Sequence, residues 1–264
     1  MPRKPRLYSG TGIYHVMLRG INRQNIFEDL EDHASMLMYM QQLLEQYDES
    51  GNRLPPLCTI YAYCLMSNHV HILLKVHEKE IGDTIKPLAV SYALYFNRKY
   101  SRTGHFFQDR FKSEPVNDME YFATLLRYIH QNPIAAGIVT EVRQYPWTSW
   151  CEYQPDMKCI LPVCTTQHVL ARLTLEELTG LVNELLPKSL KILDIDNETA
   201  IRVSDDKVRE FLMTACCVAN IVDIQHYPKT TRNDIIRQLR DYGASIRQIT
   251  RLTGISEGII RNVK

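Results

Sequence analysis

The chain has 264 residues, of which 45% are hydrophobic and 23% charged, values typical of a globular protein with one large domain or one domain and an appendage. No apolar run reaches the roughly twenty residues that span a bilayer, which excludes a membrane-spanning helix. The basic amino terminus has no hydrophobic stretch after it, and the seven cysteines form no regular framework, so we expect a cytoplasmic protein with reduced thiols and no membrane partner.

The net charge of +1 is unevenly distributed along the chain. From Lys207 to the end there are ten Lys and Arg against five Asp and Glu, whereas the rest of the chain is slightly acidic. The carboxy-terminal part is therefore the better candidate for contact with a polyanion, because local charge matters more than the sum.

Hydrophobic periodicity predicts an ordered series of elements in the first half of the chain. These are a strand over 12–20, a helix over 31–47, a hairpin of strands over 59–66 and 69–76, a helix over 81–100, an extended segment over 113–116 and a helix over 118–131. Asn117 and Glu120 resemble a capping box at the start of the last helix, and Asn132-Pro133 indicates its end. This order is typical of an α+β domain in which an antiparallel sheet carries helices on one face and leaves the second face free for a ligand.

Three regions follow from the pattern: a domain over 1–153, a helical linker region over 154–203 and an all-α domain over 204–264. The linker contains one helix that begins at Thr174. In the last region, a short helix, a turn at Gly254 and a second helix after Ser256 form a helix-turn-helix-like pattern. Its second helix would present Glu257 and Arg261 to DNA.

His69 and His71 lie two residues apart in a predicted strand, so both imidazoles project from the same face of the sheet. Taken alone, such a pair is more often structural. Tyr128 and Asn132, however, are four residues apart on a predicted helix and share a face as well. If this helix packs beside the hairpin, two imidazoles and an amide oxygen could surround a divalent metal ion next to a phenol.

This set of side chains suits phosphoryl transfer. Tyrosine is a covalent nucleophile, but with a pKa near 10 it is mostly neutral at pH 7. A metal ion on the scissile phosphate would offset negative charge and favour attack by the phenolate. The resulting phosphotyrosine bond conserves the energy of the broken bond, so strands can be rejoined without ATP.

The same residues fall within five ordered runs that resemble the single-tyrosine HUH transposases, and more closely their REP-associated tyrosine transposase branch. The runs are GIYHVMLRGINRQNIFED (12–29), YCLMSNHVHILL (63–74), GHFFQDRFKSEPV (104–116), YIHQNPIAAGIV (128–139) and YPWTSW (145–150). The resemblance covers about residues 5–153 and does not extend to the basic tail.

The resemblance implies a ferredoxin-like core, Mg²⁺ or Mn²⁺ as cofactor, and cleavage of single-stranded DNA through a 5′-phosphotyrosine. By position, Tyr128 matches the nucleophile, His69 and His71 match the metal ligands, and Asn132 stands where a third ligand is expected. Imidazole by itself would also suit zinc or nickel. The implied substrate is a hairpin-forming palindromic repeat with a flanking recognition tetranucleotide.

Other polar residues have two interpretations each. Four basic residues could hold phosphates or form a solvated surface: Arg19, Arg23, Arg110 and Lys112. His15 and His130 could be extra metal ligands, although a structural or DNA-facing role fits each better. Further tyrosines are expected to be packing residues and not nucleophiles: Tyr63, Tyr92 and Tyr95.

Two other functions remain open. One is a DNA-binding regulator that retains the transposase fold but has lost catalysis, and the other is a metal-dependent nuclease that uses water and forms no phosphotyrosine. Some relatives complete each site with a helix from a partner subunit, so both a monomer and a homodimer are compatible with the sequence.

Overall fold

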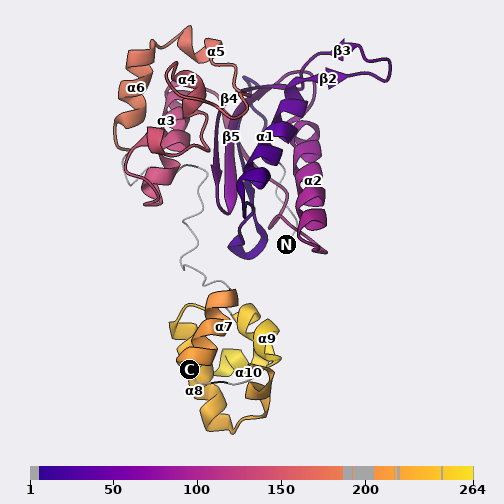
Figure 1. Cartoon of the computed structure of the whole chain (residues 1–264), viewed down its shortest axis with the longest axis vertical. Coiled ribbons are helices and arrows are strands. Elements are labelled where there is room, and N and C mark those ends of the chain that lie inside the picture. Colours follow the sequence, from indigo (N-terminus) through magenta and orange to yellow (C-terminus); the bar gives the residue numbers. More distant parts are fainter. Residues whose placement is uncertain are drawn as a thin grey trace. The chain divides into compact units, whose positions relative to one another are not determined.

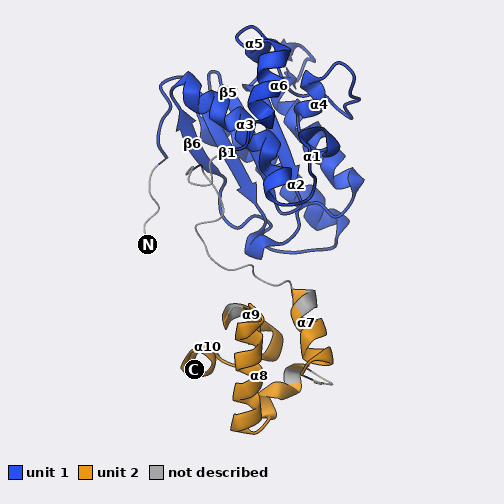
Figure 2. Cartoon of the chain, turned by 90° about the vertical axis from the view of Figure 1, so that its left-hand side faces the viewer, with its two compact units in different colours: residues 1–194 blue, residues 195–264 orange. Residues whose placement is uncertain are grey.

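The computed structural model describes residues 6–186, 192, 205–216, 218, 221–244 and 246–263. The chain forms two compact units, residues 1–194 and residues 195–264, coloured separately in Figure 2. Each unit has its own hydrophobic core.

The first unit is built on a four-stranded sheet with the strand order β4-β5-β1-β6, in which all neighbouring strands are antiparallel. The strands are β1 (Ile13–Arg19), β4 (Cys58–Met66), β5 (His69–Val76) and β6 (Lys112–Val116). Helix α1 (Leu30–Leu44) follows β1, and α2 (Ile81–Lys99) follows β5. This β-α-β-β-α-β order, with the first and third strands of the series in the centre of the sheet, is the ferredoxin-like arrangement. The predicted α+β fold class is confirmed.

Alternation along the strands separates the two faces of the sheet. In β1, Val16 and Leu18 point to one face and join the core formed with α1 and α2. The helix α1 begins at Asp29, whose side chain forms a capping box with Asp32. It ends at Leu44, earlier than predicted, because the chain then turns into a short hairpin of β2 (Gln46–Tyr47) and β3 (Arg53–Leu54).

The second face of the sheet is not free, which corrects the expectation from the sequence. Helix α3 (Met119–Ala135) packs on it, as Figure 1 shows, on the side opposite α1 and α2. The contact is apolar and joins both strands of the hairpin to the helix: Tyr61, Cys64, Leu73, Phe122, Leu125 and Ile129. The apolar stripe of α3 is buried here because burial on the sheet removes it from water.

The predicted start of α3 near Asp118 agrees with the structure, but the predicted capping residue and the predicted end were wrong. The N-cap is Asp118, whose side chain accepts the backbone N–H of Tyr121 at 2.7 Å, while the Asn117 side chain turns away to Gly10. The helix also continues through Pro133 to Ala135. Pro133 lacks the N–H that would bond Ile129 O, but only two helical residues follow it, and the burial of α3 on the sheet outweighs this loss. As a result, Asn132 lies within the helix.

The region predicted as a linker packs in large part on this unit. It contains α5 (Gln167–Leu170) and α6 (Leu175–Asn183), and α4 (Trp150–Tyr153) directly precedes it. The predicted start of α6 at Thr174 is present as a capping box with Glu177. Leu178 and Val182 are fully buried in the α3 core, and the Gln131 amide donates to Val182 O at 2.6 Å. These contacts fix α6 against the back of α3.

The second unit is all-helical, with its own apolar core. Its elements are α7 (Asp205–Thr214), the 3₁₀ turn η3 (Ile221–His226), α8 (Lys229–Asp241), α9 (Ile246–Thr253) and α10 (Glu257–Asn262). Gly254, with a φ of 75°, makes the turn between α9 and α10, a conformation that glycine adopts without a steric penalty. On α10, Ile260 is buried in this core, whereas Ile259 is 39% exposed. Within the described ranges, no helix has the length and apolar character needed to cross a bilayer.

Candidate active site

His69 and His71 open strand β5 and project from the face of the sheet that α3 covers. In the antiparallel register, His71 is opposite Met17 of β1 and Cys64 of β4, and His69 is opposite Arg19. Their exposed fractions are only 7% for His69 and 0% for His71. The predicted sharing of one face is thus present, but the face is an interior and not an open surface.

Helix α3 brings the predicted phenol and amide to the same two imidazoles. The Tyr128 ring stands edge-on to the His71 ring, with centroids 5.4 Å apart. One turn further along, Asn132 Oδ1 lies 3.3 Å from His69 Nε2. The rings of His69 and His71 are 4.9 Å apart. All four side chains predicted from the sequence therefore meet in one place, and a single chain supplies all of them.

His15 also belongs to this cluster, whereas the sequence favoured a structural or DNA-facing role for it over that of an extra ligand. It lies on β1 diagonally across from His71, and its Nε2 is 2.9 Å from His71 Nδ1. Its ring is fully buried and is 6.0 Å from the Tyr128 ring. Only the register of β1 against β5 places it there, and a single sequence does not reveal that register.

The surroundings of His69 suit a cation. Its Nδ1 lies 2.6 Å from Asn68 Oδ1, which accepts hydrogen bonds only, so in the neutral ring Nδ1 carries the proton. His69 Nε2 then has a lone pair, and it faces a second acceptor, Asn132 Oδ1. A positive ion between two lone pairs would replace their repulsion by attraction, and nitrogen and oxygen donors are ligands for divalent metals.

His71 has a nitrogen available for the same ion. Burial, together with the neighbouring His69 and His15, holds the pKa of His71 well below its ordinary value, so the ring is neutral. Its Nε2 is buried and has no hydrogen-bond partner among the described residues. The described part of the chain has no cluster of three His, Cys, Asp or Glu side chains suited to a metal. A metal site here therefore depends on the amide oxygen of Asn132 as its third protein donor.

The predicted phosphate-binding residues lie in different places. Arg19 and Lys112 share the face of the sheet that carries the histidines, since Arg19 pairs with His69 and Lys112 pairs with Met17. Lys112 is exposed and Arg19 is half-buried. Arg23 lies in the 3₁₀ turn η1 (Ile21–Arg23), and Arg110 is exposed in the loop before β6. In the second unit, Glu257 and Arg261 form an ion pair of 3.1 Å along α10.

The other residues considered from the sequence point elsewhere. His130 is buried, with Nδ1 2.7 Å from Leu126 O and Nε2 2.9 Å from Ser149 Oγ, and burial lowers its pKa to about 4. Both ring nitrogens thus have partners outside the cluster. Tyr63 and Tyr92 are buried in the core below α1 and α2, where burial raises the pKa of each phenol. These features agree with structural roles.

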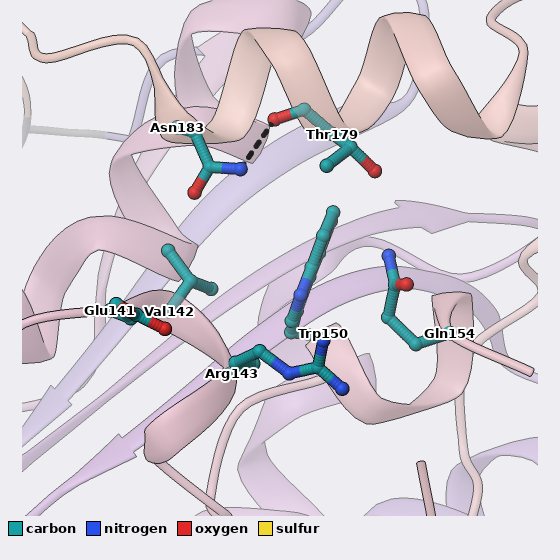
Figure 3. Close-up of a pocket in the computed structure, with 7 residues that line it drawn as sticks. All are labelled: Glu141, Val142, Arg143, Trp150, Gln154, Thr179 and Asn183. Carbon is teal, nitrogen blue, oxygen red and sulfur yellow. Dashed lines mark hydrogen bonds between the residues drawn. The ribbon is translucent and has the colours of Figure 1, made fainter. Parts of the chain in front are cut away.

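A cavity of about 270 Å³ lies beside α4 and α6, apart from the histidines. Figure 3 shows the Trp150 ring directed into it, with Thr179 and Asn183 of α6 on the opposite wall. Its complete lining is Glu141, Val142, Arg143, Trp150, Gln154, Thr179 and Asn183. None of the four predicted active-site residues lines this cavity.

Comparison with known proteins gives one family match. Residues 9–132 match the family model described as "Transposase IS200 like". This range includes His15, His69, His71, Tyr128 and Asn132. A search of curated proteins found no match.

Among solved structures, the chain is similar to a REP-associated tyrosine transposase bound to a REP hairpin, with 16% identity, a TM-score of 0.45, and coverage of 57% of this chain and 83% of that chain. It is also similar to a protein of Deinococcus radiodurans R1 assigned as a transposase, with 18% identity, a TM-score of 0.32, and coverage of 49% of this chain and 97% of that chain.

Proposed function

We propose that this protein, whose residues 9–132 match the model of the IS200-like transposase family, is a metal-dependent DNA transposase that nicks and transfers single strands through a 5′-phosphotyrosine. The observation that carries the proposal is the meeting of Tyr128 with His69, His71 and Asn132 on one face of the sheet. A phenol beside a set of neutral metal-ligating groups is the arrangement that this reaction needs.

In the proposed site, His69 Nε2, His71 Nε2 and Asn132 Oδ1 hold a divalent ion, Mg²⁺ or Mn²⁺. When bound, this ion would polarise the scissile phosphate and offset its negative charge. The protein itself orients the donors. Asn68 positions His69 through Nδ1, and α3 fixes Asn132 relative to Tyr128 because the two are four residues apart on a helix.

Tyr128 is the proposed nucleophile. Its phenol oxygen attacks the phosphorus and forms a P–O bond, while the bond from phosphorus to the 3′ oxygen of the upstream nucleotide breaks. The departing 3′ oxygen gains a proton, and the phenol loses one. The products are a 5′-phosphotyrosine and a strand with a free 3′-hydroxyl, which can attack the adduct in the reverse sense and restore a phosphodiester.

The proposed DNA contacts begin beside the site. Arg19 and Lys112 lie on the same face as the histidines and would hold the backbone on either side of the scissile phosphate, with Arg23 and Arg110 extending the track. The resemblance in the sequence favours single-stranded DNA that folds as a hairpin.

The second unit would add a DNA contact through α9, the turn and α10. Its local excess of Lys and Arg over Asp and Glu supports this role. On α10, Arg261 would contact base edges or phosphates once its ion pair with Glu257 opens.

The test is an adduct assay on denaturing gels, with labelled hairpin oligonucleotides from DNA flanking the gene and with Mn²⁺ or Mg²⁺. Wild type should give a metal-dependent, heat-stable protein–DNA band, and Tyr128→Phe should give none. Tyr121→Phe is the matched control, because Tyr121 is on the same helix but donates its hydroxyl to Glu114 at 2.6 Å. Cleavage that survives Tyr128→Phe would instead show hydrolysis by water. Hairpin binding by wild type without cleavage would show a regulator that has lost the reaction.

A further inference from the structure

His15 is placed in the middle of the sheet, where it has no contact with solvent. It lies on β1, which pairs with β5 on one side and β6 on the other, and its exposed fraction is 0%. Its Nε2 lies within hydrogen-bond distance of His71 Nδ1, so one ring donates there and the other accepts. A neutral imidazole has one nitrogen that donates and one that accepts a hydrogen bond.

The contact between His15 and His71 uses one nitrogen of each ring. His15 Nε2 and His71 Nδ1 are 2.9 Å apart, and the two ring planes are inclined by 23° with centroids 5.1 Å apart. This geometry holds the His71 ring both in position and in rotation. It leaves His71 with a single nitrogen, Nε2, for any further bond.

The direction of this hydrogen bond decides whether His71 can bind a metal. If His15 donates, the proton of His71 is on Nε2, and that nitrogen has no lone pair to offer. If His71 donates through Nδ1, then Nε2 carries the lone pair and can be a ligand. The second arrangement requires His15 to be the acceptor, with its own proton on Nδ1.

We propose that His15 is a positioning residue that accepts a hydrogen bond from His71 Nδ1 and so holds His71 Nε2 ready as a ligand. The inference rests on the proposed metal-dependent function. The neighbouring histidine has a parallel device, because Asn68 Oδ1 accepts from His69 Nδ1 at 2.6 Å. Each histidine of the pair then has an acceptor on Nδ1, supplied by a different element, and presents Nε2 to the site. Such outer partners orient ligating histidines in metal sites generally.

Four variants separate this role from packing. In His15→Gln, the side-chain amide can reach the position of the imidazole Nε2 and still accept. In His15→Asn it is one methylene too short, and in His15→Leu the acceptor is gone. His130→Gln is the matched control, since His130 is equally buried but bonds to Leu126 and Ser149.

The first measurement is the tautomer of His71, read from ¹⁵N-resolved histidine NMR spectra of the full-length, metal-free protein. We expect the proton on Nδ1 in wild type, in His15→Gln and in His130→Gln, and a mixture of tautomers in His15→Asn and His15→Leu. A wild-type spectrum with the His71 proton on Nε2 would overturn the proposal.

The second measurement is the affinity for Mn²⁺ by calorimetry. Loss of an outer partner typically weakens metal binding by about 10- to 100-fold, which is the expectation for His15→Asn and His15→Leu. His15→Gln and His130→Gln should bind as wild type does. Equal Mn²⁺ affinity of His15→Gln and His15→Asn would refute the proposed positioning role of His15. The comparison of these two variants tests the role even if His15→Leu does not fold. The absence of a DNA adduct in wild type would refute the proposed reaction but leave the tautomer result standing.

Discussion

Substitution of Gly20 by alanine should disturb the proposed active site through the chain segment that follows Gly20. Gly20 follows β1, and a Cβ there would lie 2.4 Å from the backbone oxygen of Gln24 and 2.8 Å from Ile26 Cγ2. The φ of Gly20 is −62°, which any residue can adopt, so the constraint is the space and not the dihedral angle. Because one of the atoms is backbone, the 21–26 segment itself must move.

That segment holds the turn from which His69 starts. Gly20 N donates to Asn68 O at 3.0 Å, and Ile26 N donates to Ser67 O at 2.7 Å. Asn68 in turn holds His69 Nδ1. A displaced segment therefore loosens the Ser67–Asn68 turn and with it the orientation of His69.

Gly20→Ala should cost about 1–3 kcal/mol of unfolding free energy, the usual range for overpacking a filled site. It should also weaken Mn²⁺ binding, by up to the roughly 10- to 100-fold that is typical when an outer partner of a metal ligand is lost. Gly180→Ala is the control: Gly180 lies within α6, where an added Cβ would meet no atom within 4 Å beyond the backbone of its own helix, and alanine should stabilise this helix by about 0.5–1 kcal/mol. Urea unfolding and calorimetric Mn²⁺ titration measure both effects.

A Gly20→Ala protein with wild-type stability would show that the segment shifts at little cost, contrary to the close packing argued for it. A destabilised protein with unchanged Mn²⁺ affinity would break the proposed link from this turn through Asn68 to His69. Either result would refute part of the reasoning, whereas Gly180→Ala reports only on general effects of adding a methyl group.

Three further predictions concern charge, pH and the second unit. Asn132→Asp should bind Mn²⁺ about tenfold more tightly in calorimetry, because a carboxylate adds at least about 1 kcal/mol of attraction at contact distance; unchanged affinity would exclude Asn132 as a ligand. The pKa of His130 is about 4 in the folded protein and about 6.5 when unfolded, so its share of stability, at most about 3 kcal/mol, is present above pH 6.5 and lost as the pH falls toward 4. His130→Gln should flatten this part of the pH dependence in urea unfolding, and an unchanged slope would contradict it. Removal of residues 195–264 should weaken hairpin binding in gel-shift assays but leave adduct formation, and unaltered affinity would remove the DNA-binding role of the second unit.

The sequence predicts the parts of the site that depend on local periodicity. The spacing of two residues between His69 and His71 places them on one face of a strand, and the spacing of four between Tyr128 and Asn132 places them on one face of a helix. These are properties of a single element, so the pattern suffices. The order of elements was predictable for the same reason, since hydrophobic periodicity and turn residues lie within each segment.

What the sequence did not show depends on contacts between elements. His15 enters the site through the register of β1 against β5, which local pattern does not specify. The burial of the second face depends on where α3 packs, and the packing of α6 depends on the surface that α3 leaves uncovered. The predicted helix end at Asn132-Pro133 was wrong for a related reason: the local preference of proline to end a helix is outweighed by the burial of the helix on the sheet.

The histidines make the centre of this sheet less stable than an apolar one would be. Valine at positions 15 and 71 would bring no polar side-chain atom into the interior, whereas the histidines leave His15 Nδ1 and His71 Nε2 buried without hydrogen bonds among the described residues. Each such atom costs on the order of 1–3 kcal/mol. Their mutual hydrogen bond offsets only part of this cost, because it uses the other nitrogen of each ring. A bound cation would satisfy His71 Nε2 and not His15 Nδ1. On this reasoning one unsatisfied atom is recovered when metal binds, and the other is the lasting cost of burying His15 in the sheet.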